Sequence, residues 1–318
     1  MHVKVAVLDD YLEVARSSTD WSRLPAGAEP RFFREPLAGE DAVAEALQEF
    51  DVIVAMRERT TFPASLITRL PRLRLLVTTG MRNAAIDVEA CRRQGITVCG
   101  TGAVGAPAAE LTWALILALL KRIPDEDSSL RAGGWQTGLT ETVSGKRLGV
   151  VGLGKLGTQV ARVGLAFGME VVAWSRGLTA ERAEAAGARL VDKATLFASS
   201  DVVTLHLVLG ERTQGVVGPT ELGAMKRSAY LVNTSRAGLV DEQSLVSALR
   251  EGRIAGAGLD VFSVEPLPRE HPLRSLPNTV LTPHLGYVTR ENYAVYYRDA
   301  VEDILAWSQG SPMRLLGA

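Results

Sequence analysis

Short apolar runs alternate with amphipathic segments along the first third of the chain. The runs predict strands, and the segments between them have the spacing of helices. The predicted strands are Val3–Leu8, Val52–Ala55, Leu73–Thr79 and Ile96–Cys99, and the predicted helices are Asp41–Gln48, Pro63–Arg69 and Ile86–Gln94. Strands that alternate with helices indicate βαβ units and a parallel sheet.

A second series of the same kind follows a long apolar helix. Pro107 suits the first turn of this helix, and its apolar residues continue to about Ile123. A polar connector with an irregular or helical piece comes next (124–145). The predicted strands that follow are Leu148–Val151, Glu170–Trp174, Val202–Leu205, Tyr230–Asn233, Ala257–Leu259 and Thr279–Thr282, with helices at Lys155–Phe167 and about Arg290–Ser308. This set is sufficient for a complete doubly wound sheet.

Composition narrows the class of protein. The 318 residues are 47% hydrophobic, and this length points to about two domains. The 35 Lys and Arg residues balance 36 Asp and Glu residues, which argues against a nucleic-acid partner. The longest apolar stretch, Leu111–Leu120, is about half of what a bilayer requires, and the N-terminus reads as a strand. Two cysteines exclude a disulfide scaffold and a cysteine-rich zinc site. We therefore expect a cytoplasmic protein with no membrane or metal partner.

A glycine-rich turn follows the predicted strand Leu148–Val151. The residues Gly152, Leu153, Gly154, Lys155, Leu156 and Gly157 form the pattern G-x-G-x-x-G. The first glycine allows a tight turn, the second lets the backbone approach a pyrophosphate, and the third allows close packing of helix on strand. The pattern alone also fits glycines that serve packing only, but its position between a strand and a helix favours a dinucleotide site.

The end of the next predicted strand bears on the choice of cofactor. An acidic residue normally stands there and binds the ribose 2′-hydroxyl of NAD. Here the strand ends in Ser175 and Arg176, whose hydroxyl and guanidinium suit a 2′-phosphate. The alternative is an arginine that stacks on adenine or is solvated. We favour NADP over NAD.

Four histidines leave few candidates for acid–base chemistry. His2 is terminal and His271 lies in a proline-rich loop, whereas His206 and His284 follow predicted strands. Transfer of a hydride to or from an alcohol carbon needs a group that handles the hydroxyl proton, and histidine suits this role near neutral pH. Arg236 and Glu265 also follow strands, and together they supply a carboxylate clamp and a partner that favours histidinium.

Four ordered motifs resemble the D-isomer-specific 2-hydroxyacid dehydrogenases, the group that includes phosphoglycerate dehydrogenase and glyoxylate/hydroxypyruvate reductase. The likeness covers essentially the whole chain. The matching segments are 145–157, with the glycine pattern; 233–241, with Asn-Thr-Ser-Arg; 258–266, with Glu265; and 282–286, which ends at Gly286. The resemblance implies an α/β fold of two Rossmann-like or flavodoxin-like domains with doubly wound parallel sheets. It also implies a discontinuous substrate-binding domain (1–103 with 288–318) and an inserted NAD(P)-binding domain (104–287).

The resemblance also assigns roles. It implies that Arg236 binds the substrate carboxylate, that His284 donates the proton in reduction, and that Glu265 orients His284 and stabilises its protonated form. Asp260 would bind the nicotinamide carboxamide. The other residues expected near the cofactor are Thr112, Gly152, Gly154, Lys155, Leu156, Gly157, Ser175, Arg176, His206, Thr234, Ser235 and Gly286.

The N-terminal substrate loop departs from the family pattern. The family usually has G-x-G followed by Asp-Asn, whereas this chain has Gly80, Met81 and Arg82 and then Asn-Ala-Ala. We expect the backbone amides near Met81 and Arg82 to hold a carboxylate. Arg57, where the family often has small hydroxyl residues, is a candidate for a further anion contact; the alternative is a solvated arginine or a local ion pair with Glu58.

The function that these observations favour is NAD(P)-dependent interconversion of 2-oxo acids and D-2-hydroxy acids. The resemblance also suggests a homodimer formed through the coenzyme domain. One alternative is a formate-type dehydrogenase, but the formate enzymes have glutamine where Glu265 stands. Another is a dinucleotide-sensing binding protein like the co-repressors of the same fold, and these can retain all three of Arg236, Glu265 and His284.

Overall fold

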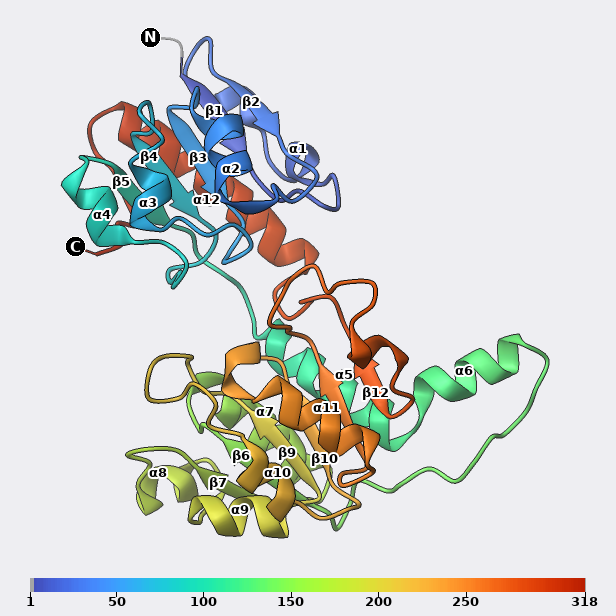
Figure 1. Cartoon of the computed structure of the whole chain (residues 1–318). Helices are drawn as coiled ribbons and strands as arrows, with labels where there is room; N and C mark the ends of the chain where they lie inside the picture. Colours follow the sequence, from blue (N-terminus) through green and yellow to red (C-terminus); the bar gives the residue numbers. More distant parts are fainter. Residues whose placement is uncertain (1–2, 318) are drawn as a thin grey trace. The chain divides into compact units, whose positions relative to one another are not determined.

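The computed structural model describes residues 3–317 and divides the chain into two compact units. Unit 1 consists of Met1–Gly105 and Thr289–Ala318, and unit 2 is Ala106–Val288 (Figure 1). Unit 2 is thus an insertion between two segments of unit 1. The substrate-binding and dinucleotide-binding roles expected of these units stay predictions.

Unit 1 is built on a parallel sheet in the order β2-β1-β3-β4-β5. Its strands are β1 (Lys4–Val7), β2 (Glu29–Phe32), β3 (Val52–Ala55), β4 (Leu75–Thr78) and β5 (Thr97–Gly100). The two middle strands β3 and β4 are buried along their whole length, because helices cover both faces of a parallel sheet. The strand order is that of flavodoxin-like folds. Successive strands are added on one side of β1 and then on the other, so the topological switch point lies between β1 and β3.

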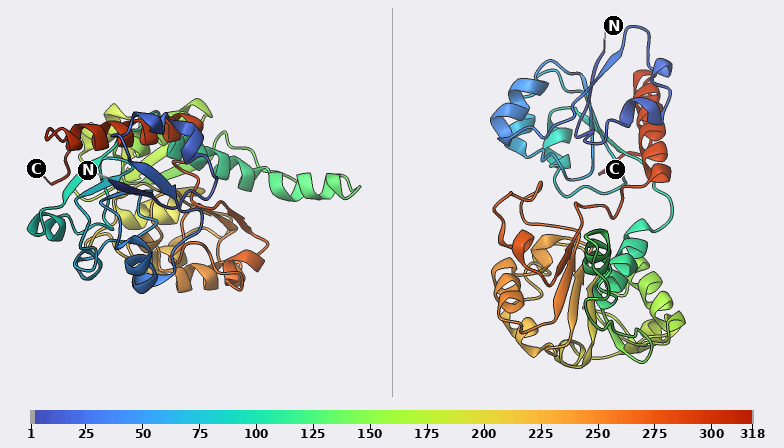
Figure 2. Two further views of the ribbon diagram at one scale, coloured as in Figure 1. Left: turned by 90° about the horizontal axis from the view of Figure 1, so that it is seen from above. Right: turned by 90° about the vertical axis from the view of Figure 1, so that its right-hand side faces the viewer.

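Helices cover both faces of this sheet. The helices of unit 1 are α1 (Ala15–Ser18), α2 (Gly39–Leu47), α3 (Ala64–Ile67), α4 (Val88–Arg93) and α12 (Arg290–Ser308), with a 3₁₀ turn at Trp21–Arg23. One apolar cluster joins α2, α3 and α4 to the strands. The C-terminal helix α12 lies on the opposite face from α2 (Figures 1 and 2) and buries three aromatic side chains there, Tyr293, Tyr296 and Tyr297.

The C-terminal tail continues unit 1 beyond α12. It runs antiparallel beside β5, where the Gly100 amide donates to the Arg314 carbonyl (2.9 Å) and the Leu316 amide donates to the Val98 carbonyl (2.9 Å). The tail therefore occupies backbone groups of a strand that would otherwise form an open sheet edge.

Unit 2 contains a parallel sheet in the order β12-β11-β10-β9-β6-β7-β8. Its strands are β6 (Arg147–Val151), β7 (Glu170–Trp174), β8 (Arg189–Leu190), β9 (Val202–Leu205), β10 (Tyr230–Asn233), β11 (Gly256–Leu259) and β12 (Thr279–Leu281). Counted from β6, this is the Rossmann order, and the direction of winding reverses between β6 and β9. Ligands of such sheets bind beyond the carboxyl ends of the strands at this point.

Two apolar layers enclose the sheet of unit 2. One joins it to α9 (Lys193–Ser199), α10 (Pro219–Ala224) and α11 (Glu242–Arg250). The other joins it to α5 (Pro107–Leu120), α7 (Lys155–Ala166) and α8 (Ala180–Ala185). Short 3₁₀ turns at Ala237–Leu239 and Pro272–Ser275 complete the unit. Each sheet is therefore doubly wound, as the sequence predicted.

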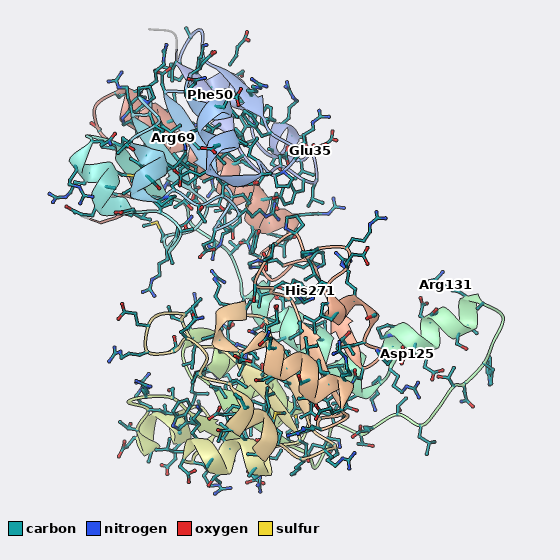
Figure 3. All side chains as sticks on the ribbon, viewed as in Figure 1. Glu35, Phe50, Arg69, Asp125, Arg131 and His271 are labelled. Carbon is teal, nitrogen blue, oxygen red and sulfur yellow. The ribbon has the colours of Figure 1, made fainter. Side chains whose placement is uncertain are left out.

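One helix of unit 2 extends away from its sheet. The helix α6 (Ile123–Arg131) has no buried residue, and Figure 3 shows Asp125 and Arg131 on it. The extended segment that follows exposes large apolar side chains, with Trp135 at 74% and Leu139 at 96%.

The structure adds elements that the apolar pattern did not predict. Strand β2 carries Pro30 and alternates between exposed and half-buried residues, because it is an edge strand that proline can occupy. Strand β8 has only two residues. The helical piece of the polar connector is α6, and the predicted helix Pro63–Arg69 is reduced to the single turn of α3. No helix within residues 3–317 has both the length and the apolar character needed to cross a membrane.

Asp303 on α12 provides a test of this packing. Its carboxyl is fully buried, and burial raises its pKa to about 7, even though the charge and hydrogen bond of Arg314 oppose this rise. A folded-state pKa above the ordinary value of 3.8 gives a stabilising contribution that is complete below about pH 4 and is lost as pH rises through about 7. We expect Asp303→Asn, which cannot ionise, to gain in Tm relative to wild type as pH rises from about 4.5 to about 7.5, by several degrees.

The measurement is thermal unfolding at a series of pH values. Asp41→Asn is the matched control, because the Asp41 side chain is 95% exposed and its replacement should change Tm by much less than that of Asp303. A Tm difference between Asp303→Asn and wild type that stays the same at every pH would contradict the assignment.

Candidate functional site

The glycine turn of unit 2 lies between β6 and α7, at the point where the sheet reverses its order. Gly152 has φ = 101°, and a Cβ there would approach the His206 carbonyl to 2.7 Å. A Cβ on Gly157 would clash with the Gly152 carbonyl oxygen, so both positions require glycine. In contrast, a Cβ on Gly154, the residue that caps α7, would meet nothing within 4 Å. The turn thus leaves open space in front of the N-terminus of α7, where backbone N–H groups favour an anion.

The neighbouring strand β7 ends at Trp174, and Ser175 and Arg176 follow it. The Ser175 carbonyl accepts a hydrogen bond from the Leu178 amide, which closes a turn, and Arg176 is exposed. No acidic residue lies at the tip of this strand. A ribose 2′-hydroxyl would therefore have no carboxylate partner here.

His206 begins the loop after β9, beside the glycine turn. Its Nε2 lies 2.9 Å from the Thr204 hydroxyl, and burial lowers its pKa to about 4. The imidazole is therefore neutral near pH 7.

Two threonine hydroxyls meet beyond the carboxyl end of β10. Thr112 on α5 and Thr234 after β10 lie 2.7 Å apart, and the Thr112 hydroxyl also contacts the Ala108 carbonyl. The Ser235 hydroxyl donates to the Leu205 carbonyl (2.7 Å), which joins the ends of β10 and β9. These side chains fix the loop that leads to Arg236.

Asn233 shapes that loop further. Its side-chain nitrogen Nδ2 donates to the Arg236 carbonyl (2.9 Å), and its side-chain oxygen Oδ1 accepts from the Ser235 amide (3.0 Å). This is the local bonding with which asparagine stabilises turns. The half-buried Arg236 guanidinium donates to the Ser235 carbonyl (2.7 Å), which orients the side chain at the carboxyl end of β10.

Glu265 and His284 form a close pair at the same edge. The distance from His284 Nδ1 to Glu265 Oε2 is 2.6 Å, and the other oxygen of Glu265 accepts from the Phe262 amide (2.9 Å). Burial alone would raise the pKa of Glu265. The hydrogen bond and charge of His284, the Phe262 amide and the charge of Arg236 together lower it. The charges of His284 and Arg236 both act on the Glu265 carboxylate, so these three residues belong to one electrostatic cluster.

Asp260 holds the segment that carries His284. This buried carboxylate follows β11 and accepts three hydrogen bonds, from the Thr282 hydroxyl (2.6 Å), the Leu285 amide (2.7 Å) and the Gly286 amide (2.9 Å). His284 itself adopts φ = 55°, a conformation that is costly for a residue other than glycine. Three hydrogen bonds to the neighbouring residues offset that cost. Asp260 thus fixes the histidine loop, a role that its motif alone did not predict.

The substrate loop of unit 1 follows β4. Gly80 has φ = 89°, its amide donates to the Thr101 hydroxyl (2.8 Å), and a Cβ at this position would clash with Arg57 Nη1. The Arg57 guanidinium therefore covers Gly80. Met81 and Arg82 are exposed next to it.

Arg57 is held in place from several sides. Its amide donates to the Thr79 hydroxyl (2.9 Å), its Nη1 donates to the Thr79 carbonyl (3.3 Å), and its carbonyl accepts from Asn83 (2.6 Å). Its Nε also lies 3.9 Å from Glu58 Oε2. The ion pair with Glu58 is thus present, but the side chain is half-buried against the loop and not merely solvated.

Of the two histidines that the sequence set aside, His2 lies outside the described residues, and His271 can be located. His271 pairs with Glu242 (3.2 Å) and lies in the loop after β11 (Figure 3), outside the cluster of Arg236, Glu265 and His284. Within residues 3–317, no three His, Cys, Asp or Glu side chains are grouped in a way that suits a metal ion.

Comparison with known proteins identifies the family. A family model described as "D-isomer specific 2-hydroxyacid dehydrogenase, NAD binding domain" matches residues 113–286. The chain belongs to the D-isomer-specific 2-hydroxyacid dehydrogenase family. The matched region includes the glycine turn and the cluster of Arg236, Glu265 and His284, so a nicotinamide dinucleotide is the cofactor class of this dehydrogenase.

Individual relatives agree with this family. A glyoxylate reductase of Aeropyrum pernix is 41% identical over 255 residues, which are 77% of this chain and 76% of the relative. A D-3-phosphoglycerate dehydrogenase of Synechocystis is 37% identical over 272 residues, which are 84% of this chain. The match spans only about half (49%) of that relative. A solved structure from Ralstonia solanacearum, described as a putative D-3-phosphoglycerate dehydrogenase, has a TM-score of 0.92 and 38% identity, and the likeness covers 98% and 96% of the two chains. The predicted fold class is confirmed.

Two of the glycines offer a test of the turn in this dehydrogenase. We expect Gly157→Ala to lower the free energy of unfolding of unit 2 by about 1–3 kcal/mol, because the new Cβ meets backbone that has no room to move. Gly154→Ala is the matched control, since it adds the same methyl group to open space. Denaturant unfolding of both variants checks this. Equal stability of the two variants would be inconsistent with the close packing of helix on strand.

Proposed function

We propose that this dehydrogenase reduces 2-oxo acids to D-2-hydroxy acids, reversibly, with NADPH favoured over NADH. The observation that carries the proposal is the 2.6 Å contact between His284 Nδ1 and Glu265 Oε2, in an electrostatic cluster with Arg236. An acid/base paired with a carboxylate, beside a cation that can bind a carboxylate, is the set of groups that the reaction requires.

The residues around the glycine turn fit a dinucleotide. The open space at Gly154, in front of the N-terminus of the twelve-residue helix α7, suits a pyrophosphate. The nicotinamide ring would supply or accept the hydride when it is bound. The residues proposed to hold the dinucleotide are Thr112, Gly152, Gly154, Lys155, Leu156, Gly157, Ser175, Arg176, His206, Thr234, Ser235, Asp260 and Gly286. Asp260 has one of its oxygens, Oδ2, bound to a single donor, the Gly286 amide, so this oxygen has capacity for a carboxamide.

The preference for NADP is supported by the end of β7. Ser175 and Arg176 stand where a carboxylate would bind the ribose of NAD, and Arg176 is exposed. A guanidinium offers positive charge and paired donors to a phosphate, and the hydroxyl can add a further donor.

The proton chemistry follows from the pair of Glu265 and His284. Because the pKa of Glu265 is lowered, this carboxylate is negative at neutral pH and holds Nδ1–H of the imidazole. Nε2 of His284 is then the nitrogen that gives a proton to the carbonyl oxygen of the substrate. Arg236 binds the substrate carboxylate as a cation, and Asp260 keeps the loop of His284 in its left-handed conformation.

The substrate loop is proposed to add anion contacts. Backbone amides at Gly80, Met81 and Arg82 would bind the carboxylate, and the Arg57 guanidinium, which covers Gly80, would add positive charge. The lowered exposure of Arg57 supports this role, since a half-buried guanidinium loses less free energy of solvation when it binds an anion.

A homodimer is also proposed. The arm of α6 and the segment after it has no buried helix residue and exposes Trp135 and Leu139. A second copy of the chain would cover these apolar side chains, which water solvates poorly.

The direct test is a substrate panel with NADPH and NADH in parallel, containing glyoxylate, hydroxypyruvate, 3-phosphohydroxypyruvate and bulkier 2-oxo acids. We expect turnover that is faster with NADPH. His284→Ala should lower kcat by about 10²- to 10⁴-fold, the range for loss of a general acid, and Arg236→Met should damage both kcat and KM. His271→Ala is the matched control, because His271 pairs with Glu242 outside the cluster, and its kcat should stay near that of wild type.

The panel also separates the alternatives. Dinucleotide binding without turnover of any 2-oxo acid would favour a dinucleotide sensor, and oxidation of formate would favour a formate-type enzyme. Near-normal turnover of His284→Ala on the best substrate would rule out the assignment of the proton donor.

Arg57 has a separate test. We expect Arg57→Met, which keeps the aliphatic stem, to raise KM for the accepted 2-oxo acids on the order of tenfold, with the largest rise for a substrate that carries a second anionic group. Arg69→Met is the matched control, because Arg69 forms its ion pairs with Glu40 and Asp41 on the surface. An unchanged KM for every accepted substrate would show that Arg57 does not contact the anion.

A further inference from the structure

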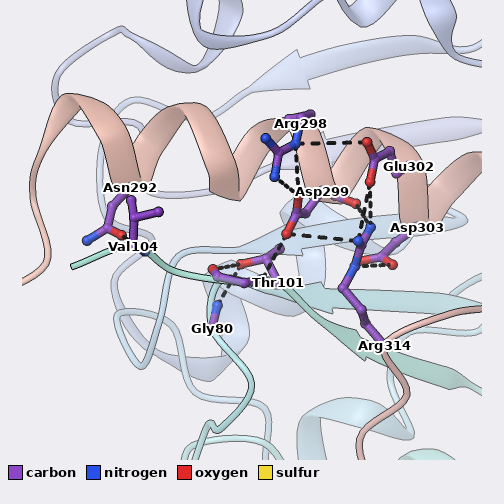
Figure 4. A network of polar contacts seen from close by, with 10 residues as sticks. Gly80, Thr101, Val104, Asn292, Arg298, Asp299, Glu302, Asp303 and Arg314 are labelled. Carbon is purple, nitrogen blue, oxygen red and sulfur yellow. Dashed lines mark hydrogen bonds and ion pairs between the residues drawn. The ribbon is translucent and has the colours of Figure 1, made fainter. Parts of the chain in front are cut away.

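One arginine joins the C-terminal tail of unit 1 to α12 and to β5 (Figure 4). The Arg314 guanidinium donates to Asp303 Oδ1 (3.0 Å), to Glu302 Oε2 (3.2 Å) and to the Asp299 carbonyl (2.8 Å). Its own carbonyl accepts the Gly100 amide at the end of β5 (2.9 Å). Arg314 therefore bonds to the helix through its side chain and to the strand through its backbone.

The segment that follows β5 is tied to the same helix. The Gly102 amide donates to Asp299 Oδ2 (2.8 Å), and the Val104 amide donates to the side-chain oxygen Oδ1 of Asn292 (2.9 Å). Thr101, the residue before Gly102, is fully buried, and its hydroxyl accepts the Gly80 amide (2.8 Å). A polar path thus runs from α12 through residues 100–104 to the first residue of the substrate loop.

Close packing reinforces this path. A Cβ on Gly100 would approach the Gly80 carbonyl to 2.7 Å, Leu316 Cδ1 to 2.7 Å and Met81 Cα to 3.1 Å. The end of β5, the C-terminal tail and the substrate loop therefore leave no free space between them. A shift of the tail must displace Gly80 and Met81, since packed interiors do not absorb such shifts elsewhere.

We propose that Arg314 is a positioning residue for the substrate loop Gly80–Arg82, and that it acts through Gly100 and Thr101 without touching the substrate. This proposal rests on the proposed function, in which the amides of that loop bind the carboxylate of a 2-oxo acid. Loss of the guanidinium would leave the Asp299 and Asp303 carboxyls close together and without their shared cation, which loosens the tail and the end of β5.

The test compares Arg314→Met with Arg314→Lys. We expect Arg314→Met to raise KM for the best 2-oxo acid on the order of tenfold, to leave kcat within about twofold, and to leave dinucleotide binding unchanged. Arg314→Lys, which keeps the positive charge beside Asp303, should recover most of the loss. A role confined to general stability would not separate KM from kcat in this way.

Arg298→Met is the matched control. Arg298 also binds Asp299 (2.8 Å) on the same helix, but it makes no bond to the tail or to β5. We expect its KM to stay within about twofold of wild type. An equal rise in KM for Arg298→Met and Arg314→Met would overturn the proposal, because it would assign the effect to the acidic cluster and not to the tail.

Hydrogen exchange separates this proposal from the proposed function. Exchange at the backbone amides of residues 79–85 needs no turnover, and Arg314→Met should accelerate it while peptides of unit 2 keep their wild-type rates. If the wild type reduces no 2-oxo acid, the proposed function fails, but this measurement still decides the role of Arg314. Unchanged exchange in the loop would overturn the proposal. So would accelerated exchange throughout both units. If Arg314→Met does not fold, the same measurement on Arg314→Gln, which removes the charge and keeps a hydrogen-bond donor, decides in its place.

Discussion

The Asp260 carboxylate is the interaction on which the site of unit 2 depends. It lies inside the protein and accepts one hydroxyl and two amide hydrogen bonds from the segment 282–286. A buried charge is tolerated only when such bonds replace water, so the loop cannot move away without exposing a costly unsatisfied carboxylate. Burial raises the pKa of Asp260, and the hydrogen bonds from Thr282, Leu285 and Gly286 oppose this rise. Through this constraint, His284 keeps the orientation in which Nδ1 meets Glu265.

Unit 1 uses the same device on a different fold. There the Asp299 carboxylate, buried on α12, accepts the Gly102 amide, and the loop beyond it is joined to Gly80 by Thr101. In both units, a buried carboxylate on a helix or directly after a strand accepts hydrogen bonds from backbone amides of a loop. Backbone amides are donors at every position, so this arrangement fixes a loop without limiting the residues that it presents. The identities of the exposed side chains Met81 and Arg82 are therefore not constrained by these hydrogen bonds.

The sequence could predict the parts of this architecture that repeat locally. Apolar runs located the central strands of both sheets, because burial on both faces demands continuous apolar residues. The same reasoning missed β2, whose residues are half-exposed and include Pro30, and the two-residue strand β8. Arg236, Glu265 and His284 could be chosen because each follows a strand, and parallel strands end at one edge of the sheet. The bonds of Asp260 and Asp299 could not, since they depend on which distant segments face each other; Gly102 and Asp299, for example, lie 197 positions apart.

Three residues beyond strand ends share a left-handed backbone conformation. Asp9, Arg57 and His284 have φ between 52° and 58°, and each lies just beyond the end of a parallel strand. This conformation costs on the order of 1 kcal/mol for such residues, so something must offset it at each position. Hydrogen bonds do so: the Asp9 carboxylate accepts from Thr60, the Arg57 carbonyl accepts from Asn83, and the neighbours of His284 donate to Asp260. A left-handed residue turns the chain sharply at the strand end. It therefore places an ionisable side chain at the carboxyl edge of the sheet, where ligands of α/β sheets bind.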